Sequence, residues 1–410
     1  MKKIMYFPYG GGHGNIVKCL YKGLAGKPEL EQKVVALTVS WRIFDDNNIP
    51  YGRLIDYRNI IKDWDKIIKI GKRLAENTEF RNPDLQYDDY CAYLGIGYYC
   101  LIDEYGEKEA EKRYVEMGRR AFCPVKVMKE ILQYEKPDAV IITCGVRTER
   151  AVGIAANELE IPVIRIADLQ EFEASGCECY TCVMNEYAKR YAVSVLNENP
   201  EHVYITGQPV FEENNIIDAE INLNIRKELK LDQYDKLIVY LEQPGLNETS
   251  SVENEIIKIA EDKTNWLFVL KQHPNQTGDL RTSICGNVLT LRKYPLNYLL
   301  YNCNLAITRD STAGLEAVLF DKALINMALA KSVNDFFSVE DFDYSRYGIS
   351  HKVTDLGDLS AAIDFCLNDA SEIAITLKGN RKLFKNAPHV IDNIYQVLIG
   401  VWSIETEVLI

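Results

Sequence analysis

The chain has 410 residues, of which 47% are apolar and 26% are charged. This composition is typical of folded globular proteins and excludes a wholly disordered or collagen-like chain, and the length predicts two or three domains. Lys and Arg number 47 against 60 Asp and Glu, which gives a formal net charge of −13. A broad basic face for nucleic acid is therefore not expected.

The first half of the chain alternates predicted strands and helices. Strands are expected at 3–9, 33–39, 139–145 and 162–168, with helices at 15–26 and 150–160. This order is typical of crossover units in a parallel sheet. Residues 45–135 are rich in Tyr and charge and have helical spacing, so they are predicted to form a helical insertion.

The second half repeats the alternation. Strands are expected within 236–245, 266–274, 287–291, 304–311 and 323–329. The predicted class is α/β, with two doubly wound Rossmann-like domains, 1–205 and 206–385, that face each other across a cleft. The final helical stretch, 386–410, is expected to cross back to the first domain. Ligands of such folds bind at the carboxyl ends of the strands.

The cysteines and the N-terminus indicate a cytoplasmic protein. The eleven cysteines lie mostly in apolar runs, and the sequence shows neither a secretory h-region nor eighteen uninterrupted apolar residues. Cys177, Cys179 and Cys182 are spaced C-x-C-x-x-C, but no second ligand pair or histidine is near them in sequence. We therefore expect no metal, and no cofactor.

The first candidate site is the loop GGGHG at 10–14, after the first predicted strand. Glycines such as Gly11 and Gly12 let backbone N–H groups approach an anion at a helix N-terminus. Asn15 replaces the third glycine of a dinucleotide fingerprint, and the Gly-Lys-Ser/Thr of a Walker loop is absent. The alternative is a tight turn without ligand. His13 is either a general base or a hydrogen-bonded turn histidine.

The second candidate site follows two strands of the second half. Lys271 and His273 end a strand and offer donors to a phosphate, although a lone strand-end histidine is more often structural. In RDSTAGLEA, Asp310, Ser311 or Thr312 can cap the next helix, and their hydroxyls and N–H groups suit a phosphate. Glu316, in the first helical turn, suits the ribose hydroxyls. The alternative is a helix cap with nothing bound.

Five segments occur in the order found in GT-B nucleotide-sugar enzymes, which include the lipid II-forming N-acetylglucosaminyltransferase and the UDP-N-acetylglucosamine 2-epimerases. The chain resembles this superfamily well over 203–330, thinly over the first strand and loop, and not over 45–135. The five segments are GGGHG, TGQPVF (206–211), LKQHP (270–274), KYPLNYLL (293–300) and RDSTAGLEAVLFDKALI (309–325).

The resemblance implies that the second domain binds the nucleotide-sugar donor and the first the acceptor. His273, Ser311 and Thr312 would hold the diphosphate, and Glu316 the ribose. Residues 292–296 would border the base, and the loop 242–245 would close over the sugar. The complete expected donor set is Gly11, Gly12, Gly245, Lys271, His273, Tyr294, Ser311, Thr312, Ala313 and Glu316.

The first domain distinguishes the activities of this superfamily. The 2-epimerases carry Arg-Pro-Glu where this chain has GGGHG. They also use acidic residues after first-domain strands, and in this chain Asp168 is shifted from the expected position. GGGHG favours transfer, with His13 and Asp168 as candidate bases and Glu171 behind them. We expect metal-independent, inverting transfer, with a UDP-sugar favoured, to a glycan or lipid-linked acceptor. The alternatives are a 2-epimerase or hydrolase, a CMP- or CDP-donor transferase, and a non-catalytic binder.

One segment bears on the acceptor. Residues 58–73 carry six Lys or Arg and two Asp, and an apolar stripe formed by Ile60, Ile61, Trp64, Ile67 and Ile68. A basic amphipathic helix can lie on an anionic membrane, so peripheral contact with the inner membrane face is one interpretation. The favoured interpretation is the core face of a surface helix. The oligomeric state is not predicted.

Overall fold

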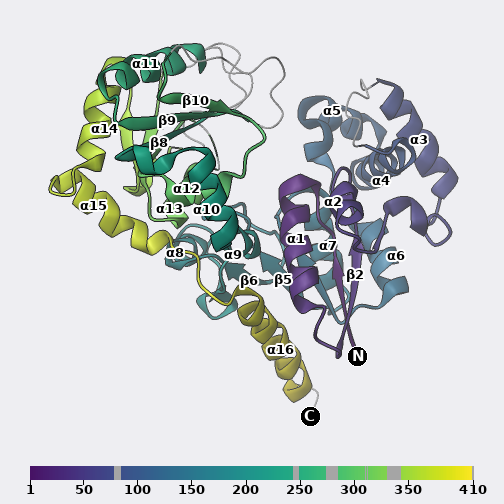
Figure 1. Ribbon diagram of the computed structural model, residues 1–410. Helices are drawn as coiled ribbons and strands as arrows, with labels where there is room; N and C mark the ends of the chain where they lie inside the picture. Colours follow the sequence, from purple (N-terminus) through teal and green to yellow (C-terminus); the bar gives the residue numbers. More distant parts are fainter. Residues whose placement is uncertain are drawn as a thin grey trace. The chain divides into compact units, whose positions relative to one another are not determined.

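The computed structural model describes residues 1–77, 85–242, 249–273, 285–309, 311, 313–329 and 343–408. The chain divides into two compact units, shown in Figure 1. Unit 1 comprises Met1–Glu213 with Asn386–Ile410, and unit 2 comprises Asn214–Lys385. The expected boundary at residues 205 and 206 therefore falls inside unit 1, and residues 386–410 group with unit 1.

Unit 1 contains a parallel sheet in the order β3-β2-β1-β4-β5-β6-β7. Its strands are β1 (Lys2–Tyr6), β2 (Leu30–Val35), β3 (Tyr51–Gly52), β4 (Ala139–Ile142), β5 (Val163–Ile166), β6 (Tyr180–Val183) and β7 (Val203–Ile205). Its α-helices are α1 (Gly10–Leu24), α2 (Trp41–Asp46), α3 (Trp64–Asn77), α4 (Tyr87–Tyr105), α5 (Glu107–Met117), α6 (Val125–Glu135), α7 (Arg147–Asn157), α8 (Glu186–Ser194), α9 (Pro209–Asn214) and α16 (Val390–Val408).

Helices cover both faces of this sheet. Along β1, Ile4 and Tyr6 point into a core that contains residues of α1 and α16, while Met5 points into a core formed with α4, α6 and α7. This alternation explains why Ile4, Met5 and Tyr6 are all buried in succession, since a parallel sheet covered by helices buries both faces. The last helix, α16, thus belongs to the core of the unit that begins the chain (Figure 1).

The predicted insertion is largely helical in the structure, with α3, α4, α5 and α6 within residues 45–135. Helices α3 and α4 pack closely, because Gly71 faces the backbone of Cys91 and Gly95 faces that of Ile67. The apolar stripe of residues 58–73 packs into the core, with Ile61 and Ile67 buried. This burial agrees with the interpretation of the stripe as the core face of a surface helix. The buried side chains of Ile61 and Ile67 are not available to a membrane.

Unit 2 contains a parallel sheet in the order β10-β9-β8-β11-β12-β13. Helices α11 and α14 bury their apolar sides on one face of it (Figure 1). The strands are β8 (Lys236–Leu241), β9 (Trp266–Lys271), β10 (Val288–Leu291), β11 (Leu305–Thr308), β12 (Ala323–Met327) and β13 (His351–Val353). The α-helices are α10 (Ala219–Glu228), α11 (Thr249–Asp262), α12 (Leu296–Asn302), α13 (Ala313–Leu319), α14 (Leu359–Leu367) and α15 (Glu372–Arg381).

The predicted fold class, α/β with two doubly wound parallel-sheet domains and a helical insertion in the first, is confirmed. Among the helices of the described residues, none is long and apolar enough to cross a bilayer.

Candidate functional site

Each sheet has a point at which the strand order reverses, between β1 and β4 in unit 1 and between β8 and β11 in unit 2. At such a point the connections leave in opposite directions, and the crevice left at the carboxyl ends of the strands is where doubly wound folds bind ligands. In unit 1, His13 follows β1 and Thr143 follows β4. In unit 2, Glu242 follows β8 and Ser311 follows β11.

The glycine segment of unit 1 is the first turn of α1, which begins at Gly10, so the segment is not a loop that precedes the helix as expected. Gly10 has a φ of +84°, a backbone conformation that favours glycine. No side chain caps this helix start. Gly11 and Gly12 are exposed, and a Cβ at either would meet no described atom. The N–H groups of this turn are thus accessible to an anion.

His13 is held by a hydrogen-bond chain that starts at a buried carboxylate. Glu149 is fully buried and accepts hydrogen bonds from the backbone N–H groups of Tyr9 (2.9 Å), Thr143 and Cys144 (3.0 Å). The Thr143 hydroxyl donates to the same carboxylate (2.9 Å). Its oxygen lies 2.9 Å from Nδ1 of His13.

This chain assigns the tautomer of His13. Because the only proton of the Thr143 hydroxyl goes to Glu149, its oxygen accepts the hydrogen bond from the Nδ1–H group of His13. Nε2 of the neutral ring then carries the lone pair. A histidine oriented in this way can accept a proton at Nε2, which is the property required of a general base.

The second candidate base, Asp168, follows β5 on the same edge of the sheet. Burial raises the pKa of its carboxyl group, and the nearby His13 opposes this shift. The side-chain amide of Gln208 donates to the backbone carbonyl of Asp168 (3.4 Å). The structure therefore brings His13 and Asp168 within electrostatic reach of each other.

A metal ligand set is formally present but chemically unsuited. One ligand atom each of His13, Cys144 and Glu149 lie within 4.8 Å of one another. Burial, and then the charge of Glu149, strongly raise the pKa of the Cys144 thiol. The Glu149 carboxylate is already occupied by backbone and hydroxyl donors. These residues do not fit a metal site.

In unit 2, the end of β9 carries two of the expected phosphate-binding residues. Lys271 is buried, and its Nζ donates to the backbone carbonyls of Gln272 (2.9 Å) and Arg292 (2.5 Å), so the described residues accept two of its three protons. Burial lowers the pKa of Lys271, whereas Glu242 raises it. Burial and then the charge of Lys271 lower the pKa of His273, which favours the neutral form of this histidine.

The β11–α13 connection holds the other expected group. The Ser311 hydroxyl accepts from the N–H of Ala313 (3.2 Å), and the Ser311 carbonyl accepts from the hydroxyl of Tyr344 (2.9 Å). Burial raises the pKa of Glu316 to about 7, and a hydrogen bond from Asn214 (3.3 Å) partly opposes the shift. A desolvated carboxyl group at this point is suited to accept hydrogen bonds from ribose hydroxyls.

Three expected donor-site residues remain. The Tyr294 hydroxyl donates to Glu228 (3.3 Å), and burial, followed by this carboxylate, raises the pKa of Tyr294 to about 12. Gly245 and Thr312 lie outside the described residues.

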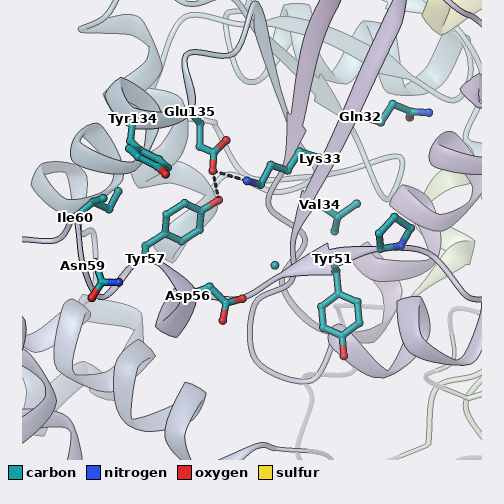
Figure 2. Close-up of a pocket in the computed structure, with 12 residues that line it drawn as sticks. Gln32, Lys33, Val34, Tyr51, Asp56, Tyr57, Asn59, Ile60, Tyr134 and Glu135 are labelled. Atoms are coloured by element: carbon teal, nitrogen blue, oxygen red, sulfur yellow. Dashed lines mark hydrogen bonds and ion pairs between the residues drawn. The ribbon is translucent and has the colours of Figure 1, made fainter.

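A pocket of about 470 Å³ lies at the β2–β3 edge of unit 1 (Figure 2). The carboxylate of Glu135 in its wall is already hydrogen-bonded by neighbouring side chains. Figure 2 shows Lys33 and the Tyr57 hydroxyl directed at the carboxylate of Glu135. Lys3 binds the other oxygen of that carboxylate at 2.6 Å. Burial raises the pKa of Glu135, but these hydrogen bonds outweigh it and lower the value. The cluster ties α6 to the sheet and has the character of a structural ion pair.

Sequence reasoning missed Thr143 and Glu149. Thr143 directly follows β4, the strand that pairs with β1. A polar residue at that position, across from the glycine segment, is the one sequence feature that could have identified it. Glu149 lies in the first turn of α7, where an acidic residue is common for helix stability alone.

We compared the chain with known proteins. No protein-family model matches the sequence, and no curated protein matches it significantly. Similar solved structures include the UDP-GlcNAc 2-epimerase of Neisseria meningitidis bound to UDP-GlcNAc, with a TM-score of 0.57, 13% identity and coverage of 98% of this chain and 99% of that chain. The UDP-GlcNAc 2-epimerase of Methanocaldococcus jannaschii has a TM-score of 0.57 and 14% identity, with coverage of 98% of this chain and 100% of that chain. The glycosyltransferase SnogD from Streptomyces nogalater has a TM-score of 0.52 and 13% identity, with coverage of 97% of this chain and 99% of that chain.

These structures cover nearly the whole chain at low identity, so the similarity establishes a shared fold. The chain has the GT-B fold, as the sequence resemblance implied. Structures named as epimerases and as a glycosyltransferase both have this fold, so the fold by itself does not assign an activity to the chain.

Proposed function

We propose that the protein is a glycosyltransferase that moves a sugar from a nucleotide-sugar donor, with UDP as the favoured nucleotide, to a hydroxyl group of a glycan or lipid-linked acceptor. The observation that carries the proposal is the Glu149–Thr143–His13 chain at the switch point of unit 1. Its geometry presents a proton acceptor at Nε2, whereas a cap or turn histidine has no need of a fixed tautomer. UDP is favoured because similar structures are named for UDP-sugar enzymes.

The donor is assigned to unit 2. Glu316 would accept hydrogen bonds from the ribose, and its raised pKa shows that burial penalises the charge when no ligand is present. Ser311, His273 and the remaining proton of Lys271 would contact the diphosphate. Neutral His273 can take up a proton as negative charge accumulates on the departing phosphate.

The reaction is a direct displacement. The acceptor hydroxyl gives its proton to Nε2 of His13, and its oxygen forms a bond to the anomeric carbon. The bond from that carbon to the phosphate oxygen breaks, and its electron pair leaves with the nucleoside diphosphate. The configuration at the anomeric carbon is thereby inverted. Charge on the leaving group is met by side chains of unit 2, so no step calls for a metal ion.

Thermal unfolding with UDP, GDP, CDP, CMP and dTDP in turn tests the donor assignment. A nucleotide at about 100 times its Kd stabilises the folded state by roughly 2.7 kcal/mol, which raises the midpoint by several degrees. A shift confined to UDP supports the proposal, and a shift confined to CMP or CDP moves it to a different donor class. If none of the five nucleotides shifts the midpoint, the donor site is refuted.

The base assignment is tested by His13→Ala. Loss of a general base is expected to reduce turnover by about 10²- to 10⁴-fold, with the affinity for UDP nearly unchanged. His389→Ala, an exposed histidine of unit 1, is the matched control. Unaltered turnover of the His13 variant would refute its catalytic role.

A sugar-nucleotide 2-epimerase or hydrolase is the second candidate, because 2-epimerases share the fold and because Asp168 lies near His13. These activities consume the donor alone, whereas a transferase releases nucleotide only when an acceptor is present. Incubation of a UDP-sugar without acceptor, followed by product analysis, therefore distinguishes the two. Epimerised sugar nucleotide in that reaction would replace the proposal of transfer.

A further inference from the structure

A second pocket of unit 1, of about 780 Å³, lies among α4, α5, α6 and α7. Much of it belongs to the helical insertion, the segment to which the GT-B resemblance does not extend. The volume falls in the range typical of small-molecule sites. Its wall carries six basic side chains, Arg113, Arg120, Lys126, Lys129, Arg147 and Arg150, against three acidic ones, Asp103, Glu104 and Glu158. This local excess of positive charge contrasts with the net charge of −13 of the whole chain.

Half of these basic groups are neutralised by neighbours. Ion pairs join Arg113 to Glu109 (3.0 Å), Lys126 to Asp103 (3.0 Å) and Lys129 to Glu158 (2.9 Å). The other three are Arg120, Arg147 and Arg150. Within the described part of the chain, none of these three guanidinium groups has an ion pair or a side-chain hydrogen bond.

Arg147 is held in place without a polar partner. It is the first residue of α7 and has a φ of +54°, a conformation that costs a non-glycine residue about 1 kcal/mol or more. Its guanidinium group lies 4.9 Å from the centre of the Tyr9 ring. Its Nε is buried and, among the described residues, has no hydrogen-bond partner. A buried donor group without a hydrogen-bond acceptor lowers the stability of the folded protein unless a ligand supplies the acceptor.

From these observations we infer that this pocket binds an anionic oxyacid group, a phosphate or a carboxylate, of the acceptor. The planar fork of a guanidinium group matches both groups with paired hydrogen bonds, and three such forks without acidic partners line one pocket. Phe122 and Ile154 add apolar wall for the uncharged part of the acceptor. The inference rests on the proposed transfer reaction, since it names the chemistry of the acceptor.

Isothermal titration calorimetry in the presence of saturating UDP tests the pocket, because UDP then occupies the donor site. The probes are methyl phosphate, glucuronate and uncharged glucose. We expect at least one anionic probe to bind and glucose not to bind. The variant Arg120→Gln/Arg150→Gln should raise the Kd of that probe by about tenfold or more, since each lost charged hydrogen bond weakens binding. Both side chains are exposed, so the variant should fold.

Arg58→Gln is the matched control, because Arg58 is an exposed arginine of unit 1 outside the pocket. It should leave the Kd unchanged, and a Kd that rises equally in both variants overturns the inference. Binding of methyl phosphate alone assigns a phosphorylated acceptor, and binding of glucuronate alone assigns an acidic sugar. If neither anionic probe binds, the inference of an anion-binding pocket is overturned. UDP binding in the same experiment would still support the donor site. Conversely, anion binding without UDP binding overturns the proposed function alone.

Discussion

Thr143 orients His13, the base in the proposed reaction, because its hydroxyl both receives the Nδ1–H group and donates to Glu149. We predict that Thr143→Val reduces kcat by about 10- to 100-fold, part of the contribution of a general base, since the base is retained but no longer oriented. The KM for the donor should not change. The measurement is a pH profile of kcat, whose limb assigned to the base should shift in the variant.

Thr143→Ser is the control for this prediction, because it keeps the hydroxyl and should restore most of the activity. Thr143 is completely buried, so thermal unfolding of both variants must accompany the kinetics. Equal loss of activity in the Ser and Val variants would mean that the residue acts through packing.

Glu316 is expected to lower the free energy of unfolding, although it contributes to the proposed nucleotide binding. Its pKa of about 7 lies above the ordinary glutamate value, so the unfolded chain releases this proton at lower pH than the folded chain does. The carboxyl group therefore disfavours folding increasingly as the pH rises from about 4.5 through 7. Glu316→Gln should accordingly raise the free energy of unfolding by about 2 kcal/mol at pH 8, and have little effect near pH 4.

The same variant should bind UDP more weakly, because the amide replaces a charged acceptor of the ribose hydroxyls with a neutral one. The affinity ratio of the unaltered protein to the variant should increase as the pH rises through 7. Urea unfolding and UDP titration at pH 4, 6 and 8 measure both effects. Glu261→Gln, an exposed glutamate of α11, is the control and should change neither. A variant destabilised at pH 8 would contradict the assigned desolvation.

At the residue scale, the sequence predicted several candidate groups that follow strands, but it missed Thr143 and Glu149, the two residues that orient His13. His13, Asp168 and Ser311 could be named because residues after parallel strands share one edge of a sheet. Glu149 could not, because its role depends on three backbone N–H groups, from Tyr9, Thr143 and Cys144, that only the folded chain brings together.

The crossing of α3 and α4 is the element-scale feature that shapes the insertion. At Gly95 an added Cβ would overlap the carbonyl oxygen of Ile67, a backbone atom that cannot move alone. We predict that Gly95→Ala destabilises unit 1 by more than about 2 kcal/mol, although alanine is the better helix former. Gly400→Ala in α16 is the matched control. No described atom lies within 4 Å of the Cβ at position 400, so this change should stabilise by about 0.5–1 kcal/mol.

Chemical denaturation of both glycine variants measures the difference. If Gly95→Ala is as stable as the unaltered protein, the close helix crossing is incorrect.

The elements that the sequence did not predict are those with little pattern of their own. β3 has two residues and β13 three, too few for a periodicity to appear. β6 lies in the cysteine-rich segment, and Cys182, one of the three cysteines weighed as metal ligands, is completely buried in this strand. The start of α1 differed because glycines are expected in turns, whereas here they form the first helical turn.

At the scale of the whole molecule, the doubly wound class was predictable because parallel strands buried on both faces are apolar throughout and alternate with helices. The strand order was not predictable from this pattern. It is fixed by long-range pairing such as β1 with β4, whose partners Ile4 and Ala139 are separated by the entire insertion.

The assignment of α16 to unit 1 leads to the last prediction. Leu398 is completely buried in a core with Val17 of α1 and Ile141 of β4, although α16 follows unit 2 in the chain. Leu398→Ala should therefore lower the free energy of unfolding of unit 1 by about 2–5 kcal/mol, the range for removal of a buried leucine side chain. Hydrogen exchange should accelerate in α1 and β1 and stay unchanged in α11 and α14. Ile399→Ala, a partly exposed neighbour in the same helix, is the control and should have a much smaller effect. Faster exchange confined to residues 214–385 would show that α16 stabilises unit 2 instead.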